Sequence, residues 1–306
     1  MKTSTVTARS NLQFFSPLLE SLWRSLSLVK RSRRGLIGFV VLLGFIGMAA
    51  VGPLIIPLDL SINLSRAYLP MSSDHLFGTD QGGRDVFSLV VYGSRQVLLV
   101  AFLAGFFTVS VGVAIGLISG LKEGKMDDAL MLISDFALTI PGVPLILVLV
   151  SIIGYGRTTN PLLLAGILSI TAWASLARSI RSQVLSLKER EFVEAAKTLG
   201  LSTFHILFRE LLPNITYYVA INFLYAMVGA IYALIGLFFL GLLPFDVTNW
   251  GIILYNAQYY GVVFKEGLLT KGTLIGPILS IVLLQTGLVL LCSGLEEIFN
   301  PRLRTD

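Results

Sequence analysis

Six separate segments of this chain are apolar over a length that can cross a lipid bilayer, and this limits the fold more than any other feature. A spanning helix needs about 20 apolar residues, because the hydrocarbon core is about 30 Å thick. The segments cover residues 36–57, 96–120, 129–154, 161–180, 215–243 and 273–293. We therefore expect an all-α membrane protein with six transmembrane helices.

The composition excludes an ordinary soluble domain, since 55% of the 306 residues are hydrophobic and only 13% are charged. The one cysteine, Cys292, lies in the last segment and excludes a disulfide within the chain and a thiolate metal cluster. We expect no metal site. The first apolar segment is too long for the core of a signal peptide, so it is expected to remain as a helix.

Positive charge is distributed unevenly between the loops. If the amino terminus is cytoplasmic, 17 of the 23 Lys and Arg residues fall in the inner segments. The positive-inside rule then places both termini in the cytoplasm. Because membrane topology explains the net charge of +5, a nucleic-acid partner is not required.

The chain divides into three predicted regions. Residues 1–35 form a cytoplasmic tail with an amphipathic interfacial helix, which begins at Ser16 and Pro17, a typical helix start. A disordered tail is the alternative for this part. Residues 36–293 form the six-helix domain, and residues 294–306 form a second cytoplasmic tail.

A polar stretch, residues 188–213, interrupts the apolar segments and predicts a helical hairpin. Its apolar side chains recur at helical spacing, at Phe192, Ala195, Ala196 and Leu199. Gly200 suits the left-handed residue that ends a helix, and Ser202 can cap the next one. The second helix is expected to end near Leu211, because Pro213 disfavours helical geometry in the residue before it. An amphipathic loop on the membrane surface is the alternative.

The second apolar segment carries small residues at a spacing of four, Ala104, Thr108, Gly112, Gly116 and Gly120. Such a row lets another helix approach closely. The neighbour is either another helix of this chain or a second membrane subunit, and both alternatives remain open.

The third segment contains Asp135, a single carboxylate at membrane depth. Its insertion costs roughly 3 kcal/mol, so it should face protein or water. It either pairs within the helix bundle or lines a transport pathway.

Several motifs resemble those of one transporter family. Glu194-Ala195-Ala196, Gly200 and Leu212-Pro213 together resemble the signature loop of ABC importer permeases. HLFGTDQGGRDVFSLVVYGSR, residues 75–95, resembles the segment that marks the second permease, the "C" subunit type, of dipeptide, oligopeptide and nickel importers. Further similar segments are GKMDD at 124–128, NWG at 249–251 and NPRLR at 300–304. The resemblance covers roughly residues 30–304.

The resemblance implies a type I importer permease fold with a cytoplasmic coupling helix-turn-helix, which docks into an ATPase subunit. In this loop Glu194 would contribute a charge, Ala195 and Ala196 would allow close approach, and Gly200 would make the turn. Implied partners are a second homologous permease, two cytoplasmic ATPases that bind ATP and magnesium, and an extracytoplasmic substrate-binding protein. Glu210 departs from the family pattern, which usually has a histidine there.

A membrane-embedded enzyme is the main alternative class. Its catalytic dyad cannot form, because His75 is predicted outside and His205 inside. The chain has no GxxxxGK[ST] phosphate loop, so ATP hydrolysis is expected in partner subunits and no cofactor is expected here. A purely structural scaffold is harder to reconcile with the polar hairpin.

The cargo is expected to be an oligopeptide, with an oligosaccharide as the alternative. Nickel is disfavoured because a nickel path should offer imidazole or thioether ligands, and both histidines lie at the faces. An outer loop offers aromatic rings that would contact cargo or anchor the chain in the interface, at Trp250, Tyr255, Tyr259 and Tyr260.

Overall fold

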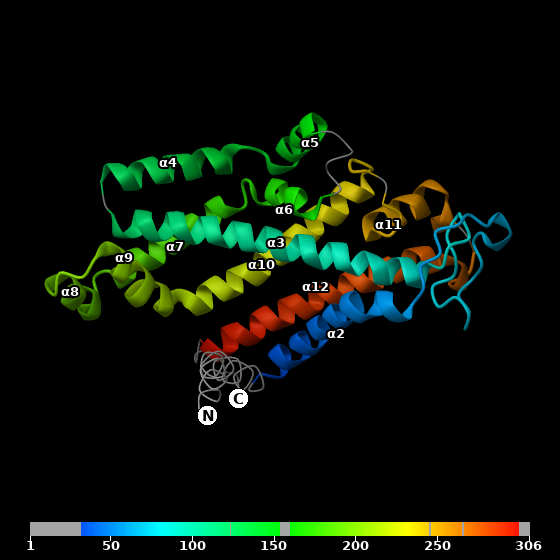
Figure 1. Ribbon diagram of the computed structural model, residues 1–306, viewed down its shortest axis with the longest axis horizontal. Coiled ribbons are helices and arrows are strands. Elements are labelled where there is room, and N and C mark those ends of the chain that lie inside the picture. The colour runs from blue at the N-terminus through cyan, green and yellow to red at the C-terminus, as the bar shows by residue number, and fades with distance from the viewer. Residues whose placement is uncertain (1–31, 123, 154–159, 245, 265, 300–306) are drawn as a thin grey trace, which may run out of the picture.

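The computed structural model describes residues 32–122, 124–153, 160–244, 246–264 and 266–299. The predicted interfacial helix and the NPRLR motif lie outside these residues. In the described part of the chain every regular element is helical, apart from one isolated bridge between Thr79 and Asp85. The long helices run along the longest axis of the molecule (Figure 1).

Within the described residues, four helices are long and apolar enough to cross a membrane without a break. They are α2 (Arg33–Ile55), α3 (Val86–Leu121), α12 (Gly272–Phe299), and α10 (Leu212–Phe239) with the short turns α9 (Thr203–His205) and η2 (Ile206–Leu211) before it. The predicted segment 96–120 lies inside α3, whose 36 residues give a length of about 54 Å, so this helix is longer than the hydrocarbon core of a bilayer. The chain after residue 293 is helical up to Phe299.

The predicted segments 129–154 and 161–180 are each bent pairs of helices rather than straight spans. The axes of α4 (Lys125–Thr139) and α5 (Gly142–Ile153) differ by 84°, and those of α6 (Pro161–Ser169) and α7 (Trp173–Leu187) by 58°. The first bend lies at Ile140, whose backbone is extended at φ −76° and ψ 122°. A residue before proline avoids the helical region, so Pro141 explains this break. If each bent pair is one span, the described part of the chain contains six candidate spans, the number that the sequence predicts.

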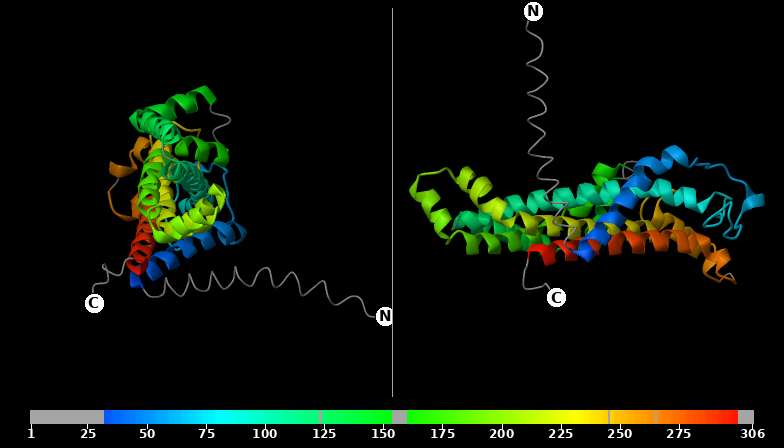
Figure 2. Two further views of the ribbon diagram at one scale, coloured as in Figure 1. Left: turned by 90° about the vertical axis from the view of Figure 1, so that its left-hand side faces the viewer. Right: turned by 90° about the horizontal axis from the view of Figure 1, so that it is seen from below.

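Helix α3 lies at the centre of the bundle, against α6, α7 and α10, while α2 packs along α12 (Figures 1 and 2). The start of α2 lies beside the end of α12, where the Ser32 hydroxyl donates a hydrogen bond to the Glu297 carboxylate at 2.6 Å. Two clusters of buried side chains hold the helices together. The larger one surrounds Trp250 and Phe238, and the smaller one joins α3 and α7 to the helical hairpin.

Residues 56–85 form a folded cap at the other end of the bundle (Figure 1). Asp80 is buried and accepts hydrogen bonds from the backbone N–H groups of Gly82 and Arg84 at 2.8 and 2.9 Å. Gly83 has a φ of +78°, and a Cβ there would lie 2.1 Å from the Asn63 carbonyl oxygen. The cap includes η1 (Leu64–Arg66).

The chain passes from this cap directly into α3. Asp85 makes the start of α3, where its carboxylate accepts the Ser88 N–H at 2.7 Å. The remaining short elements are α11 (Trp250–Tyr259), η3 (Val262–Phe264) and η4 (Leu269–Lys271), which connect α10 to α12.

Candidate coupling hairpin and central cavity

The helical hairpin begins with α8 (Glu191–Thr198) and turns at Gly200, whose φ is +70°. The Gly200 N–H donates to the Lys197 carbonyl at 2.9 Å, and the Leu201 N–H donates to the Ala196 carbonyl at 3.1 Å. These paired bonds are the Schellman pattern that ends a helix with a left-handed residue. Ser202 then caps α9 by accepting the His205 N–H at 3.2 Å. Local sequence therefore determines both sides of the turn.

The second arm of the hairpin does not end near Leu211, which corrects the expectation from sequence. Residues Ile206–Leu211 form a π-helical turn in which the Leu212 N–H donates to the Leu207 carbonyl. The chain then continues into α10, with Pro213 in its first turn. Proline is tolerated in the first turn of a helix, and π-helical turns occur as local interruptions of longer helices. The hairpin and the spanning helix are thus continuous.

Helix α8 buries a face that includes Ala196 but not the other three apolar residues of the helical pattern. Val193 is fully buried and Ala196 is 4% exposed, and both pack in the smaller cluster with Ile180 and Leu211. In contrast, Phe192, Ala195 and Leu199 are exposed. Their helical spacing is present in the sequence, but the contact with α7 and η2 selects the neighbouring face.

The exposed side of the hairpin combines apolar and polar groups at the far end of the molecule, which we call the coupling surface (Figure 1). It consists of Phe192, Glu194, Ala195, Leu199, Phe204 and Phe208. Leu199 is 76% exposed and Phe204 is 69% exposed. The rings of Phe204 and Phe208 lie 4.4 Å apart. Large apolar side chains that gather at an exposed place are typical of a protein–protein or membrane contact site.

The remaining predicted residues of the hairpin differ in their burial and contacts. Leu212 is partly buried against the smaller cluster, whereas Pro213 is exposed. Glu210, which departs from the family pattern, lies 3.7 Å from the His205 imidazole nitrogen.

Two ion pairs join α4 to α7. Asp135 pairs with Arg178, and these side chains are 53% and 49% exposed. Asp127 is buried, accepts the Ser119 hydroxyl, and contacts Arg181 through Nε at 2.7 Å. Sequence reasoning singled out Asp135 and missed Asp127. The pair of arginines three residues apart on α7 is the signal that could have indicated two partners.

The small-residue stripe on α3 has two environments. Gly112, Gly116 and Gly120 face α7, where a Cβ on Gly116 would lie 2.6 Å from both the Ala177 oxygen and the Ile180 Cβ. The stripe therefore allows close helix packing within the chain. Ala104 and Thr108 instead line a cavity.

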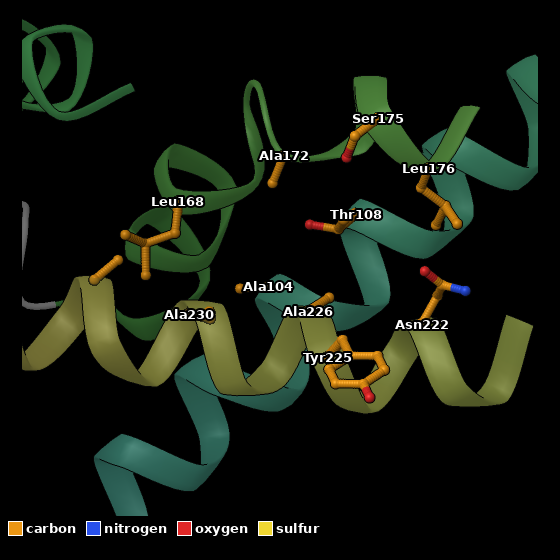
Figure 3. Close-up of a pocket in the computed structure, with 12 residues that line it drawn as sticks. Ala104, Thr108, Leu168, Ala172, Ser175, Leu176, Asn222, Tyr225, Ala226 and Ala230 are labelled. Carbon is orange, nitrogen blue, oxygen red and sulfur yellow. The ribbon is translucent and has the colours of Figure 1, made fainter. Parts of the chain in front are cut away.

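This cavity has a volume of about 420 Å³ and lies between α3, α7 and α10, beside the α6–α7 bend (Figure 3). None of the described residues that line it is charged. The lining residues are Ala104, Thr108, Leu168, Ala172, Ser175, Leu176, Asn222, Tyr225, Ala226, Gly229, Ala230 and Ala233. Asp135 is not among them. A search of the described residues for groups of His, Cys, Asp and Glu that could hold a metal ion found none.

The outer aromatic residues do not act as one group. Trp250 is fully buried, and its indole N–H donates to the Val90 carbonyl at 2.9 Å. It therefore holds α11 against α3 and cannot contact cargo. Tyr255 and Tyr259 are stacked with their ring centres 5.9 Å apart, and Tyr259 is 71% exposed.

Comparison with known proteins identifies the family. Residues 112–305 match the family of binding-protein-dependent transport system inner membrane components. The chain is 33% identical to the dipeptide transport system permease protein DppC of Bacillus subtilis over 294 residues, which cover 93% of this chain and 86% of the relative. It is 31% identical to the oligopeptide transport system permease protein OppC of the same organism, over 93% of this chain and 91% of the relative.

A family match over more than half of the chain, together with these relatives, is consistent with the all-helical bundle. It also shows that the chain is a multi-pass component of a transporter rather than an enzyme. The chain therefore belongs to the permeases of binding-protein-dependent transport systems, the inner membrane components of ABC importers.

Proposed function

We propose that this chain is the second permease of an oligopeptide importer and that its helical hairpin receives the movement of a cytoplasmic ATPase. The continuity of the hairpin with α10 is the observation that carries this proposal. A helix that begins in the coupling surface and continues along the cavity wall can transmit a displacement without a flexible joint.

The packing of α8 supports the same role. Val193 and Ala196 fix α8 to a buried cluster that includes Ile206, Leu207 and Leu211 of the second arm. The two arms therefore move together, because a close-packed interior transmits strain. Glu194 and Ala195 stay exposed and free to contact a partner.

The proposal includes an assembly and an orientation. A second homologous permease completes the transport pathway, two ATPases bind ATP and magnesium, and a substrate-binding protein delivers cargo from outside. Both termini and the hairpin are cytoplasmic, because the inner segments carry most of the Lys and Arg residues.

The oligopeptide cargo rests on the relatives, whose names refer to dipeptide and oligopeptide transport. An oligosaccharide is the second candidate, and the exposed Tyr259 and Tyr260 are the rings that would favour it. Nickel is disfavoured, since the two histidines pair with Asp85 and Glu210 away from the cavity.

Reconstitution of the complete transporter in vesicles tests both parts of the proposal. A cysteine in place of Glu194 should form a cross-link with the ATPase subunit, whereas one in place of Tyr259, at the opposite end, should not. ATP-dependent uptake should be seen with labelled oligopeptides. Uptake of sugars or nickel alone would refute the cargo, and cross-linking at Tyr259 but not Glu194 would refute the docking site.

A further inference from the structure

The central cavity contains polar groups from three different helices, and the transport role of the chain does not by itself assign them. Thr108 comes from α3, Ser175 from α7 and Asn222 from α10. In Figure 3 the Thr108 and Ser175 hydroxyls and the Asn222 side chain point into the same space. Because these residues are far apart in sequence, the fold itself brings them together.

The hydrogen bonds within the protein leave polar atoms of these three residues available to a ligand. Thr108 is 6% exposed, and no hydrogen bond to its hydroxyl or to that of Ser175 is found among the described residues. The Asn222 amide donates from Nδ2 to the Tyr218 carbonyl at 2.8 Å, which leaves Oδ1 as an acceptor. Thr108 is nearly buried, and a buried polar group without a partner is costly, so its hydroxyl favours a polar ligand. Ser175 and Asn222 add polar groups at more exposed positions of the same cavity.

The remainder of the cavity determines the kind of ligand. The Tyr225 hydroxyl is engaged with Glu296 at 3.3 Å, so Tyr225 offers mainly its ring. The other lining residues are alanines, leucines and Gly229. A neutral wall with two hydroxyl donors and one amide acceptor matches a peptide unit, whose carbonyl accepts, whose N–H donates and whose side chains are varied. A sugar ring would leave most of its hydroxyl groups facing apolar atoms.

The space is large enough and open to entry. Its volume of about 420 Å³ falls within the range of small-molecule sites, and Ser175, Tyr225 and Gly229 are exposed at its opening. A Cβ added to Gly229 would meet nothing within 4 Å. The absence of a side chain at Gly229 therefore keeps the space free rather than serving helix packing.

We propose that this cavity is a transit site in which Thr108, Ser175 and Asn222 hydrogen-bond one peptide unit of the passing cargo. This inference rests on the proposed oligopeptide transport. Recognition of the backbone would let a single permease accept peptides of different sequence.

The hydrogen bond to Asn222 is tested by changing the side chain in the protein and the amide in the peptide, each alone and both together. Uptake of a tripeptide is compared with that of an analogue in which an ester oxygen replaces one amide N–H, in vesicles that contain the complete transporter. We expect the ester to be transported at least threefold more slowly by the wild type. In Asn222→Leu the peptide and the ester should be transported at nearly equal rates, because the acceptor is gone. Thr216→Val is the matched control, since the Thr216 hydroxyl bonds within α10 to the Leu212 carbonyl and lies outside the cavity.

Filling the cavity gives an independent test. Gly229→Leu should reduce peptide uptake at least tenfold, whereas Gly236→Leu should leave it within twofold. Gly236 is a matched control because it lies on the same helix and has equal space for a side chain. Both variants are measured in complexes purified with their partners.

Different results would contradict the transit site and the proposed peptide transport. If the wild type transports no peptide, the proposed function is wrong. If it transports peptide but the ester ratio is the same in wild type and Asn222→Leu, and Gly229→Leu transports normally, the transit site is wrong.

Discussion

Asp127 and Arg181 lie 54 positions apart in sequence, yet their side chains meet through two contacts that fasten α4 to α7. Ser119 donates to the same carboxylate, so three helices share one buried anion. The neighbouring pair of Asp135 and Arg178 joins the same two helices at a place where both side chains are about half exposed.

The two ion pairs should therefore differ in their contribution to stability. Asp127→Ala leaves the Arg181 charge partly buried without its partner, and we expect a loss of about 2 kcal/mol or more. Asp135→Ala should cost less, because both side chains of its ion pair are about half exposed and lose less protein contact than Asp127 and Arg181 do. Thermal unfolding of the purified transporter measures both. Equal losses of stability in Asp127→Ala and Asp135→Ala would contradict the argument that the more buried ion pair contributes more.

The close packing of α3 on α7 predicts strong intolerance at Gly116. Gly116→Ala places a Cβ within 2.6 Å of the Ala177 carbonyl, so the helices must separate, at a cost of about 1–3 kcal/mol. Gly44→Ala on α2 is the control, because nothing lies within 4 Å of its added Cβ. A lowered melting temperature in Gly116→Ala, with little change in Gly44→Ala, is the expected result. The reverse order would show that α3 and α7 are not in close contact.

Trp250 gives a prediction that separates structure from cargo contact. Trp250→Phe retains much of the buried ring but removes the indole N–H that donates to the Val90 carbonyl, which should cost about 0.5–1.5 kcal/mol. The ratio of uptake between different peptides should not change, because the side chain is fully buried. Melting temperature and competitive uptake measure the two effects. A change in peptide preference without a loss of stability would contradict the assignment.

Hydropathy predicts where the spans are, because burial in lipid requires long apolar runs whatever the tertiary contacts. The predicted segment 36–57 and the observed Arg33–Ile55 differ by only a few residues. The bends are harder to predict. Pro53 and Pro277 lie inside continuous helices, whereas the chain breaks at Pro141. Proline alone does not decide, since neighbouring groups can satisfy the freed backbone.

The hairpin shows the same division between local and tertiary effects. Gly200 and Ser202 act through their own backbone conformation, so the sequence predicts the turn and its cap. The buried face of α8 depends on contacts with α7 and η2, and periodicity over eight residues does not distinguish Val193 from Phe192. The cavity was not predicted at all, because its walls come from four helices.

The turn of the hairpin gives the most direct test of coupling. Gly200 has a φ of +70°, and a Cβ there would meet nothing within 4 Å, so only backbone conformation restricts this position. Valine is strongly disfavoured at positive φ, whereas asparagine tolerates it. Gly200→Val should therefore distort the coupling surface and reduce ATP-dependent uptake at least tenfold, and Gly200→Asn should retain most of it. Uptake is measured in vesicles, with copurification of the ATPase as a measure of docking. If Gly200→Val assembles and transports at the normal rate, the left-handed turn is not needed for coupling.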